Sequence, residues 1–427
     1  MKHFKPFDIV HLNTLDIPLD TALLPLKENK YVVLWWKNIP LCHVFLYANE
    51  YSSKEKLLER LFNELWTAID YYAVQQNTWP DESVKESWFK QDAEKWNEFL
   101  EHICGMYLPN KPLDHEVSIV ICTRNRSAFL QTCLQKLDEQ VYAPKEIIVV
   151  DNAPLDDSTK KVVESFSNVT YCLEERPGLD FARNAGARAA TGDIVAFTDD
   201  DAMLHPLWTY YISNAFYRDD IMGVTGLIFA SEIVSEAQMI FESFWSFNRG
   251  YVSKEFNNDY FKEHLAKGVP AWEIGAGASM AFRKKIFDLI GYFDERLDVG
   301  AAGCSGDSEY WYRVLAEGYT IIYTPLAVAH HEHRREIKAL KRQIFFYMRG
   351  FTAALYVQHE RYRHKGNLRH LYRKVLPYYI TILPKAMRYR FQYNYSTYMQ
   401  ELKGIFSGLL FYYRNKRKLL QPKPVKR

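Results

Sequence analysis

Between Val117 and Ala230 the chain alternates short apolar runs with longer segments in which apolar residues recur at helical spacing. The apolar runs fit five strands, at 117–122, 146–150, 169–173, 193–198 and 222–230. The segments between the first four strands predict three helices, one ending near Gln140, one starting near Ser158 and one covering 178–190. Strands that alternate with helices of this length favour an α/β fold, in which a mostly parallel sheet is covered by helices on both faces.

The residues on either side of this region follow other patterns. Residues 1–112 predict a small α+β accessory domain, with two strands around Asn38-Ile39-Pro40 and amphipathic helices within 52–75 and 88–103. Residues 336–427 predict a basic, aromatic helical extension whose segments are interrupted at Pro377 and Pro384. We therefore expect three parts, at 1–112, 113–335 and 336–427.

Charge is divided unevenly between these parts. Residues 334–427 contain 23 Lys and Arg but only three acids, although the formal net charge of the whole chain is only +2. A basic tail on an acidic body indicates an anionic partner, or a tail that packs on the body itself. Because no nucleic-acid motif is recognised, we expect no nucleic-acid partner. Binding to an anionic membrane surface and packing on the acidic body remain open alternatives.

The cysteines and the hydropathy bear on the compartment. The six cysteines form no CxxC pair, so a reducing compartment is the simpler interpretation and a zinc site is not expected. The first 20 residues lack the continuous apolar core of a signal peptide, and no window of about 18 residues is both uncharged and mostly apolar. We expect a cytoplasmic protein without a membrane-spanning helix. Under the first of the two alternatives for the basic extension, the protein is peripheral on the inner face of the cell membrane.

Polar side chains follow three of the predicted strands, as Thr123-Arg124-Asn125, Asp151-Asn152 and Asp199-Asp200-Asp201. Ligands of such sheets collect outside the carboxyl ends of the strands, so these three sites are expected to converge. Clustered carboxylates are costly unless a cation neutralises them, and Mg²⁺ or Mn²⁺ prefers a few carboxylates together with substrate phosphates. A lone triple aspartate favours a solvated acidic turn, but the three sites together favour metal-assisted handling of a phosphorylated ligand.

Four longer segments resemble a known family. The stretches "VSIVICTRNR", "EIIVVDNA", "GLDFARNAGARAATGDIVAFTDDDA" and "GDSEYWYRVLAEGY" occur in the order and spacing of the family 2 glycosyltransferases, over about residues 115–335. Members of that family are inverting enzymes with the GT-A fold, which has a nucleotide-binding sheet and an acceptor half. The resemblance implies transfer of a sugar from a UDP-, GDP- or dTDP-sugar to an acceptor hydroxyl, with Mn²⁺ or Mg²⁺ as cofactor.

The resemblance also assigns donor-site roles to individual positions. Thr123 and Arg124 match the loop that borders the nucleotide, and Asp151 matches the acid that hydrogen-bonds the nucleobase. The remaining matches are Arg183 and Asn184 near the ribose and diphosphate, Asp199 and Asp201 at the metal and diphosphate, and Asp200 near the ribose. Taken singly, Asp151 also fits a turn-forming residue and Arg183 a solvated helix charge.

The general base is implied to be Asp307, in the stretch "SGDSEYWYRVL". The chain departs from the family pattern at Gly306, where a glutamate is common, so Glu309 remains a candidate that assists or substitutes at the acceptor side. The alternative for Asp307 is a helix cap, with Ser305 as a competitor for that position.

A histidine after Pro325 and Ala327 matches one that approaches the metal in this family, which implies His331 as the third metal ligand. His330 and His333 are competitors, and the three histidines also fit a separate metal site or exposed polar residues.

The segment "WEIGAGASMAFRKK", residues 272–285, matches the floor of the acceptor site. Trp272 is a candidate for stacking on a sugar ring, and Gly275 and Ala276 would let a ligand approach the backbone. Tight packing of a strand against a helix explains these small residues equally well.

Together these features predict a metal-dependent inverting glycosyltransferase that acts on a cell-surface glycan or its lipid-linked precursor. The rival enzyme is a sugar-phosphate nucleotidyltransferase, but "CTRNRSAF" is not the Gly-rich, basic loop expected of that class. The rival from another class is a non-catalytic glycan-binding or scaffold protein. Retention of the aspartates and of Asp307 argues against that scaffold.

Overall fold

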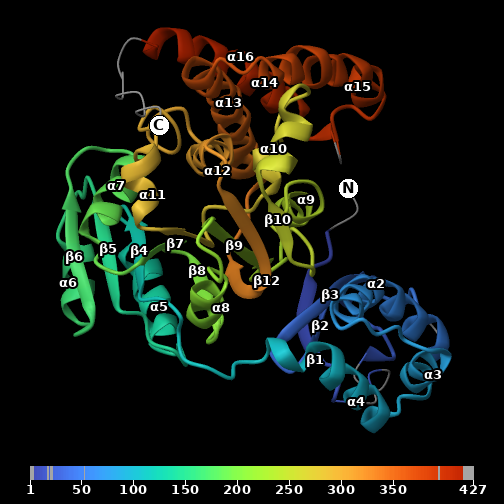
Figure 1. Cartoon of the computed structure of the whole chain (residues 1–427). Coiled ribbons are helices and arrows are strands. Elements are labelled where there is room, and N and C mark those ends of the chain that lie inside the picture. The colour runs from blue at the N-terminus through green and yellow to red at the C-terminus, as the bar shows by residue number, and fades with distance from the viewer. Residues whose placement is uncertain (1–3, 17–18, 20–22, 52, 393–394, 417–427) are drawn as a thin grey trace. The chain divides into compact units, whose positions relative to one another are not determined.

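The computed structural model describes residues 4–16, 19, 23–51, 53–392 and 395–416 (Figure 1). The chain forms two compact units. The first comprises Met1–Pro112 with the short segments Ala230–Met239 and Gly250–Ser253, and the second comprises Leu113–Phe229, Ile240–Arg249 and Lys254–Arg427. Residues 417–427, which belong to the predicted basic extension, lie outside the described part.

The first unit contains a three-stranded sheet in the order β1-β2-β3. Strands β2 (Asn29–Trp36) and β3 (Ile39–Leu46) form the expected hairpin, with Lys37 in the left-handed region at the turn, and β1 (Phe7–Asn13) adds in parallel to β2. Three helices follow, α2 (Lys54–Gln75), α3 (Glu82–Lys90) and α4 (Ala93–Cys104), and a 3₁₀ turn η1 (Gly105–Tyr107) ends the unit.

The second unit is built on a nine-stranded sheet in the order β10-β12-β9-β11-β7-β4-β5-β6, with β8 paired to β12. One half is parallel and contains β4 (Val117–Thr123), β5 (Glu146–Asn152), β6 (Val169–Glu174) and β7 (Ile194–Asp199). The other half includes the antiparallel pairs of β8 (Ala202–Leu204), β9 (Ile221–Ala230), β10 (Lys254–Phe256), β11 (Met280–Arg283) and β12 (Thr320–His331). The expected α/β fold class is thus confirmed, with its parallel part confined to four strands.

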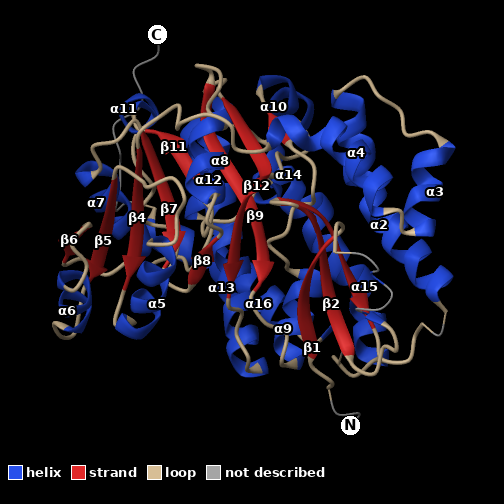
Figure 2. Ribbon diagram, turned by 90° about the horizontal axis from the view of Figure 1, so that it is seen from below, coloured by secondary structure: helices blue, strands red, loops and turns tan. Residues whose placement is uncertain are grey.

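Helices cover this sheet (Figure 2). The chain runs outward through α5 (Ser127–Leu137) and α6 (Ser158–Glu164), then returns through α7 (Leu179–Ala189) to the far side of β4. Because parallel crossovers are right-handed, α7 lies on the opposite face from α5 and α6, and the strand order reverses between β4 and β7. Such a reversal opens a crevice at the carboxyl ends of the strands. The other helices are α8 (Trp208–Asn214), α9 (Glu236–Phe244), α10 (Asn258–Leu265), η2 (Ala271–Glu273), α11 (Lys285–Ile290) and α12 (Gly306–Ala316).

The described part of the C-terminal extension belongs to the second unit. It contains α13 (Ile337–Tyr362), α14 (Gly366–His370), a π-helical turn η3 (Leu371–Val375), α15 (Leu376–Arg388) and α16 (Tyr398–Asn415). Gly404 and Gly408 bring α16 against α13, where a Cβ would lie 2.5 Å from the carbonyl oxygen of Phe345 and 2.4 Å from that of Arg349. Helix α15 begins beside Pro377 as expected but continues through Pro384, which corrects the predicted break. Among the described residues, no helix is both long and apolar enough to cross a bilayer.

Candidate active site

The carboxyl ends of β7, β4 and β5 bring three of the predicted polar sites to one edge of the sheet. The ladders pair Cys122 with Asp199 and Thr123 with Asp151, so the residues that follow these strands share that edge. The register explains why separate polar stretches of the sequence converge, because parallel neighbours end at the same side.

The triple aspartate is held by specific hydrogen bonds. Thr123 Oγ1 donates to Asp200 Oδ2 at 2.7 Å, and Arg126 donates to Asp200 Oδ1 at 2.6 Å and to Asp201 Oδ2 at 2.7 Å. Burial raises the pKa of Asp200 to about 7, against the lowering effect of the Arg126 charge. Burial opposes ionisation of Asp201 too, but His331 and Arg126 hold the pKa of that carboxyl below its usual range. Sequence reasoning missed Arg126, although it lies in the quoted stretch "CTRNR".

His331 reaches the aspartates through the sheet. Strands β12 and β8 pair His331 with Ala202, which places Nε2 of His331 3.2 Å from Asp201 Oδ1 and 3.7 Å from Asp199 Oδ2. One ligand atom from each of these three residues lies within 4.8 Å of the others. Two carboxylates and an imidazole suit Mn²⁺ or Mg²⁺ that also binds phosphate oxygens, so the residues fit the expected ion.

The two competing histidines are placed differently. The His333 ring is buried in the same pocket, with Nε2 3.4 Å from Glu242 Oε2 and its ring centroid 5.3 Å from that of His331. His330 packs against the ring of Phe229 and does not line the pocket. The structure therefore groups His331, and neither competitor, with the aspartates.

Asp307 lies in the first turn of α12 and faces the same pocket. Its Oδ1 accepts hydrogen bonds from the backbone N of Ser308 at 2.6 Å and from the Ser308 hydroxyl at 3.2 Å. Ser305 forms no side-chain capping bond. Burial raises the pKa of Asp307 and the negative charge of Asp298 adds to this effect, whereas Arg183 opposes it. A pocket-facing carboxylate with a raised pKa suits a general base.

The glycine before Asp307 has a steric reason. A Cβ at Gly306 would lie 2.2 Å from Oδ2 of Asp180, so no side chain fits there without displacing that carboxylate. The position of Asp180 in α7 therefore explains why glycine stands at 306, where the family commonly has glutamate.

Arg183 is enclosed by carboxylates. Its Nη1 donates to Asp180 Oδ1 at 3.0 Å and to Asp298 Oδ2 at 2.6 Å, and the side chain lines the pocket. A Cβ on Gly277 would lie 2.7 Å from Arg183 Nη2 and 3.2 Å from Asp307 Oδ2, so the guanidinium and the candidate base both approach that glycine. Sequence reasoning missed Asp180 and Asp298. The i, i+3 spacing of Asp180 and Arg183 was the available signal for Asp180.

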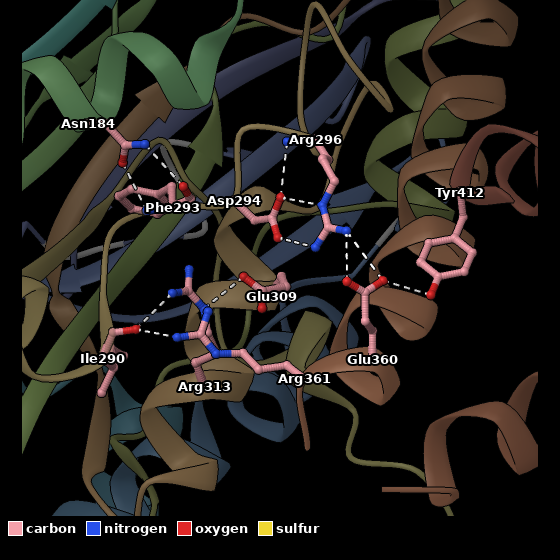
Figure 3. A network of polar contacts seen from close by, with 10 residues as sticks. All are labelled: Asn184, Ile290, Phe293, Asp294, Arg296, Glu309, Arg313, Glu360, Arg361 and Tyr412. Carbon is pink, nitrogen blue, oxygen red and sulfur yellow. Dashed lines mark hydrogen bonds and ion pairs between the residues drawn. The ribbon is translucent and has the colours of Figure 1, made fainter. Parts of the chain in front are cut away.

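Two of the predicted nucleotide-binding residues lie outside the pocket. Asn184 Nδ2 donates to the carbonyl of Phe293 at 3.0 Å and its Oδ1 accepts from the N–H of Phe293 at 2.9 Å, so the amide ties α7 to a loop (Figure 3). Asp151 is fully buried, where its Oδ2 accepts from the hydroxyl of Tyr171 at 2.9 Å. Neither residue lines the pocket.

Glu309, the other candidate on the acceptor side, also lies outside the pocket. It points away from the pocket into the protein, where Oε2 accepts from Arg313 Nε at 2.9 Å, and both side chains are 0% exposed (Figure 3). In this network Arg313 and Arg361 both donate to the carbonyl of Ile290, so α12 is tied to α13. Residues two apart on a helix point about 200° apart, which is why Asp307 and Glu309 face opposite sides.

These groups surround one pocket of about 1,490 Å³ in the second unit. It gathers most of the predicted site residues, namely Thr123, Arg124, Arg183, Asp199, Asp200, Asp201, Trp272, Gly275, Ala276, Asp307 and His331. Its far wall comes from the C-terminal helices and carries Phe346, Phe351, Lys374, Val375, Tyr378 and Tyr379. The sequence did not reveal this wall, because the helical pattern does not show where the extension packs.

The candidate acceptor segment is densely packed. The Trp272 ring lies 5.2 Å from Phe351 and 5.4 Å from His370, and its backbone carbonyl accepts from Arg249 at 3.0 Å. A Cβ at Gly275 would lie 2.6 Å from Cβ of Thr225, so close approach of β9 explains this glycine by itself.

Comparisons with known proteins agree with this geometry. A family model described as "Glycosyl transferase family 2" matches residues 118–291. The chain is 24% identical over 186 residues to a glucosyl-dolichyl phosphate glucuronosyltransferase of Haloferax volcanii, which covers 42% of this chain and 56% of the relative. It is also 24% identical over 235 residues to glycosyltransferase AglE of the same organism, which covers 53% and 70%. The chain thus spans only about half the length of the first of these relatives.

Among solved structures, a mannosyltransferase of Pyrobaculum calidifontis in complex with GDP-Man and Mn²⁺ matches 72% of this chain and 92% of its own, at 17% identity and a TM-score of 0.47. The family match covers the strands and loops that build the carboxylate edge of the pocket. Residues 118–291 of the chain are thus a glycosyl transferase family 2 domain, and the relatives that the chain resembles are glycosyltransferases.

Proposed function

We propose that the protein moves a sugar from a nucleotide-diphosphate-sugar to an acceptor hydroxyl with inversion, in a metal-dependent reaction. The observation that carries this proposal is a single pocket lined both by the group of Asp199, Asp201 and His331 and by Asp307. A cation site for a diphosphate and a carboxylate with a raised pKa are the two functions that a single displacement of this kind needs.

Asp307 acts as the general base in this proposal. Its carboxylate takes the proton of the acceptor hydroxyl while the acceptor oxygen forms a bond to the anomeric carbon of the sugar. The bond from that carbon to the diphosphate breaks, and its electron pair leaves with the nucleoside diphosphate. Attack from the side opposite the leaving group inverts the anomeric centre.

The donor site would be organised around the triple aspartate. Asp199, Asp201 and His331 would hold Mn²⁺ or Mg²⁺, and the ion, when bound, supplies Lewis-acid stabilisation of the charge on the leaving diphosphate. Thr123 and Arg126 keep the carboxylates of Asp200 and Asp201 in place. Arg124 is exposed at the pocket and available to a phosphate of a UDP-, GDP- or dTDP-sugar.

The acceptor would enter from the aromatic side of the pocket. Trp272 and Tyr378 line that side, and Lys374 adds a positive charge there. A cell-surface glycan or its lipid-linked precursor fits these side chains, because sugar rings pack on aromatic faces and a linking phosphate pairs with a cation. In this proposal residues 113–335 are the catalytic domain, 1–112 an accessory domain and 336–427 an extension that attaches the enzyme to the inner face of the cell membrane.

Donor binding is the direct test of the metal group. We expect Mn²⁺ together with one of the UDP-, GDP- or dTDP-sugars to raise the thermal stability of the full chain. The stabilisation would be about 2.7 kcal/mol when the donor is present at about 100 times its Kd. Asp201→Ala should remove most of this stabilisation, because it deletes one of the three ligand groups.

The matched control is Asp288→Ala, which removes an exposed acid from α11. This variant should keep the full shift in melting temperature with Mn²⁺ and donor. An unchanged shift in Asp201→Ala, or no shift of the parent chain with any of the three donors, would contradict the proposed function.

The pH dependence of kcat/KM tests the base. Since burial and Asp298 raise the pKa of Asp307, activity should fall as the pH drops through a value above the usual carboxyl range. Asp298→Asn removes the negative charge that raises the pKa of Asp307, and it leaves Arg183 with one carboxylate partner fewer. Both changes lower the pKa of Asp307, so the acidic limb of the profile should move to lower pH.

Other charged or titratable groups near Asp307 must be included when the profile is interpreted. They are Asp180, Arg183, Arg249, Asp298, Cys304 and Tyr347. The exposed-acid variant Asp288→Asn should leave the acidic limb of the pH profile unchanged. A limb that moves to higher pH in Asp298→Asn would show that another group is the base.

A further inference from the structure

The segment formed by η3 and α15 has two apolar faces. Leu371, Tyr379 and Ala386 are buried in a hydrophobic cluster with residues of α13 and α16, among them Met348 and Tyr398. This inward face accounts for the packing of the segment on the second unit. A surface helix that packs on only one side needs no second apolar face.

A second apolar stripe runs along the outward side of the same segment. Its members are Tyr372, Leu376, Ile380, Leu383 and Met387, at spacings of four, four, three and four residues. All are exposed except Leu376, which is half-buried and also packs against the inward cluster, and Ile380 reaches 72% exposure. The hydroxyl of Tyr372 is hydrogen-bonded to that of Tyr356 on α13. Helical spacing of this kind makes the five side chains one continuous stripe. Contiguous exposed apolar surface of this kind marks an interaction site.

Positive charge accompanies the stripe. The stretch 366–390 contains no acid, and its six basic side chains, Arg369, Arg373, Lys374, Lys385, Arg388 and Arg390, are all exposed. The acids nearest in sequence are already bonded within the protein. Glu360 accepts from Arg296 and Tyr412. Glu401 accepts from Tyr379 and Thr397. The exposed surface of the segment therefore combines an apolar stripe with cations that no acid of the same stretch balances, although Lys374 lines the pocket and Lys385 points away from Leu383 and Met387.

Helix α16 repeats the pattern. Met399, Phe406, Leu410 and Tyr413 are exposed at helical spacing, together with Lys403 and Arg414. Ten of the 23 large apolar side chains exposed in the described part of the chain lie between Tyr372 and Tyr413. Figure 1 shows α14, α15 and α16 along one edge of the second unit, and α15 contacts α16. The exposed apolar surface is thus concentrated on these helices.

We propose that the outward face of α15 docks the enzyme on an anionic lipid bilayer. The stripe from Tyr372 to Met387 enters the boundary between headgroups and acyl chains, and the flanking Lys and Arg side chains pair with lipid phosphates. A second copy of the chain fits this face less well, because two such surfaces in contact would bring like charges together. The bilayer is therefore the occupant that the charge favours.

Docking would also orient the active site. Lys374, Val375 and Tyr378 belong to this segment and line the pocket that holds Asp307. The wall of the pocket on that side would then lie at the lipid surface, within reach of an acceptor whose lipid anchor remains in the bilayer. This consequence rests on the transfer reaction of the proposed function, whereas the docking does not require that reaction.

Vesicle binding by the full chain tests the proposal. The chain should sediment with phosphatidylcholine vesicles that contain phosphatidylglycerol, bind pure phosphatidylcholine vesicles weakly, and lose binding as salt increases. Ile380→Asp/Leu383→Asp should lower the vesicle-bound partition at least about tenfold. Arg373→Gln/Arg388→Gln, at exposed cations next to Tyr372 and Met387, should lower it about 25-fold, at about fivefold per cation.

The matched control is Leu173→Asp/Leu289→Asp, which places two acids at exposed leucines of β6 and α11. It should bind vesicles like the parent chain. If Ile380→Asp/Leu383→Asp melts below the parent, Ile380→Ser alone gives the same comparison with a milder change. Release of nucleoside diphosphate from the donor, measured without vesicles, should be unchanged in the stripe variants and reports on the proposed function separately.

Three outcomes overturn the docking proposal. They are a parent chain that does not bind the anionic vesicles, stripe variants that bind them as well as the parent does, and a control that loses binding equally. A parent that is dimeric without lipid and becomes monomeric in Ile380→Asp/Leu383→Asp, with no vesicle binding, would assign the stripe to a second copy of the chain.

Discussion

Asp307→Asn is expected to lower kcat by about 10²–10⁴-fold and to leave donor affinity nearly unchanged. The carboxylate faces the pocket from the first turn of α12, and its only hydrogen bonds among the described contacts are with Ser308. An amide has nearly the same shape but does not accept the proton of the acceptor hydroxyl. Initial rates with saturating donor, together with donor binding by calorimetry, separate the loss of chemistry from a loss of binding.

The control for Asp307→Asn is Asp288→Asn, which changes an exposed acid of α11 that does not line the pocket. This variant should retain the kcat of the parent. If Asp307→Asn kept more than about a tenth of the parent kcat, Asp307 would not be the base, and another pocket-facing carboxylate would have to take the proton.

Glu309→Ala is expected to cost about 3–5 kcal/mol of unfolding free energy, because it leaves Arg313 buried without its counter-charge. Arg313 is 0% exposed, and the ion pair to Glu309 lies inside the network that ties α12 to the end of α11 at Ile290 (Figure 3). The free energy of unfolding is measured by urea titration, in which unfolding is monitored through a signal from the second unit. This loss of stability contrasts with Asp307→Asn, which breaks no ion pair in the interior.

The comparison variant for this pair is Glu309→Leu/Arg313→Met, which removes both charges and keeps apolar volume. Replacing a whole buried pair in this way is often neutral or stabilising, so the double variant should recover much of the stability lost in Glu309→Ala. Unfolding of Glu309→Ala within about 1 kcal/mol of the parent would show that the Arg313 charge is compensated elsewhere.

The convergence of polar residues at the strand ends was predictable because it depends on local pattern. Thr123 and Asp199 each follow a short apolar strand, and parallel strands in one sheet end at the same edge. The pairing of β12 with β8 then brings His331 to the aspartates, as the resemblance implied. The antiparallel half of the sheet was not predicted, because apolar runs do not state which strand they pair with.

One physical cause explains why some predicted site residues lie outside the pocket. Asn184 and Glu309 lie in predicted helices at the expected places, yet their side chains bond inside the protein. Sequence spacing shows where a residue lies on a helix but not which side of that helix faces the interior. Arg126 and Asp298 were missed for the related reason that their partners, Asp200 and Arg183, are distant in sequence.

The sequence by itself determined the α/β class, the family and the set of carboxylates at the strand ends, since each follows from short-range pattern along the chain. The tertiary structure alone decided that Asp307 faces the pocket and Glu309 the interior, and that Asp180 occupies the space above Gly306. It alone also placed η3 and α15 so that one side closes the pocket and another leaves an apolar stripe exposed. These features depend on which surfaces pack together over long sequence separations, and packing is settled only by the folded chain as a whole.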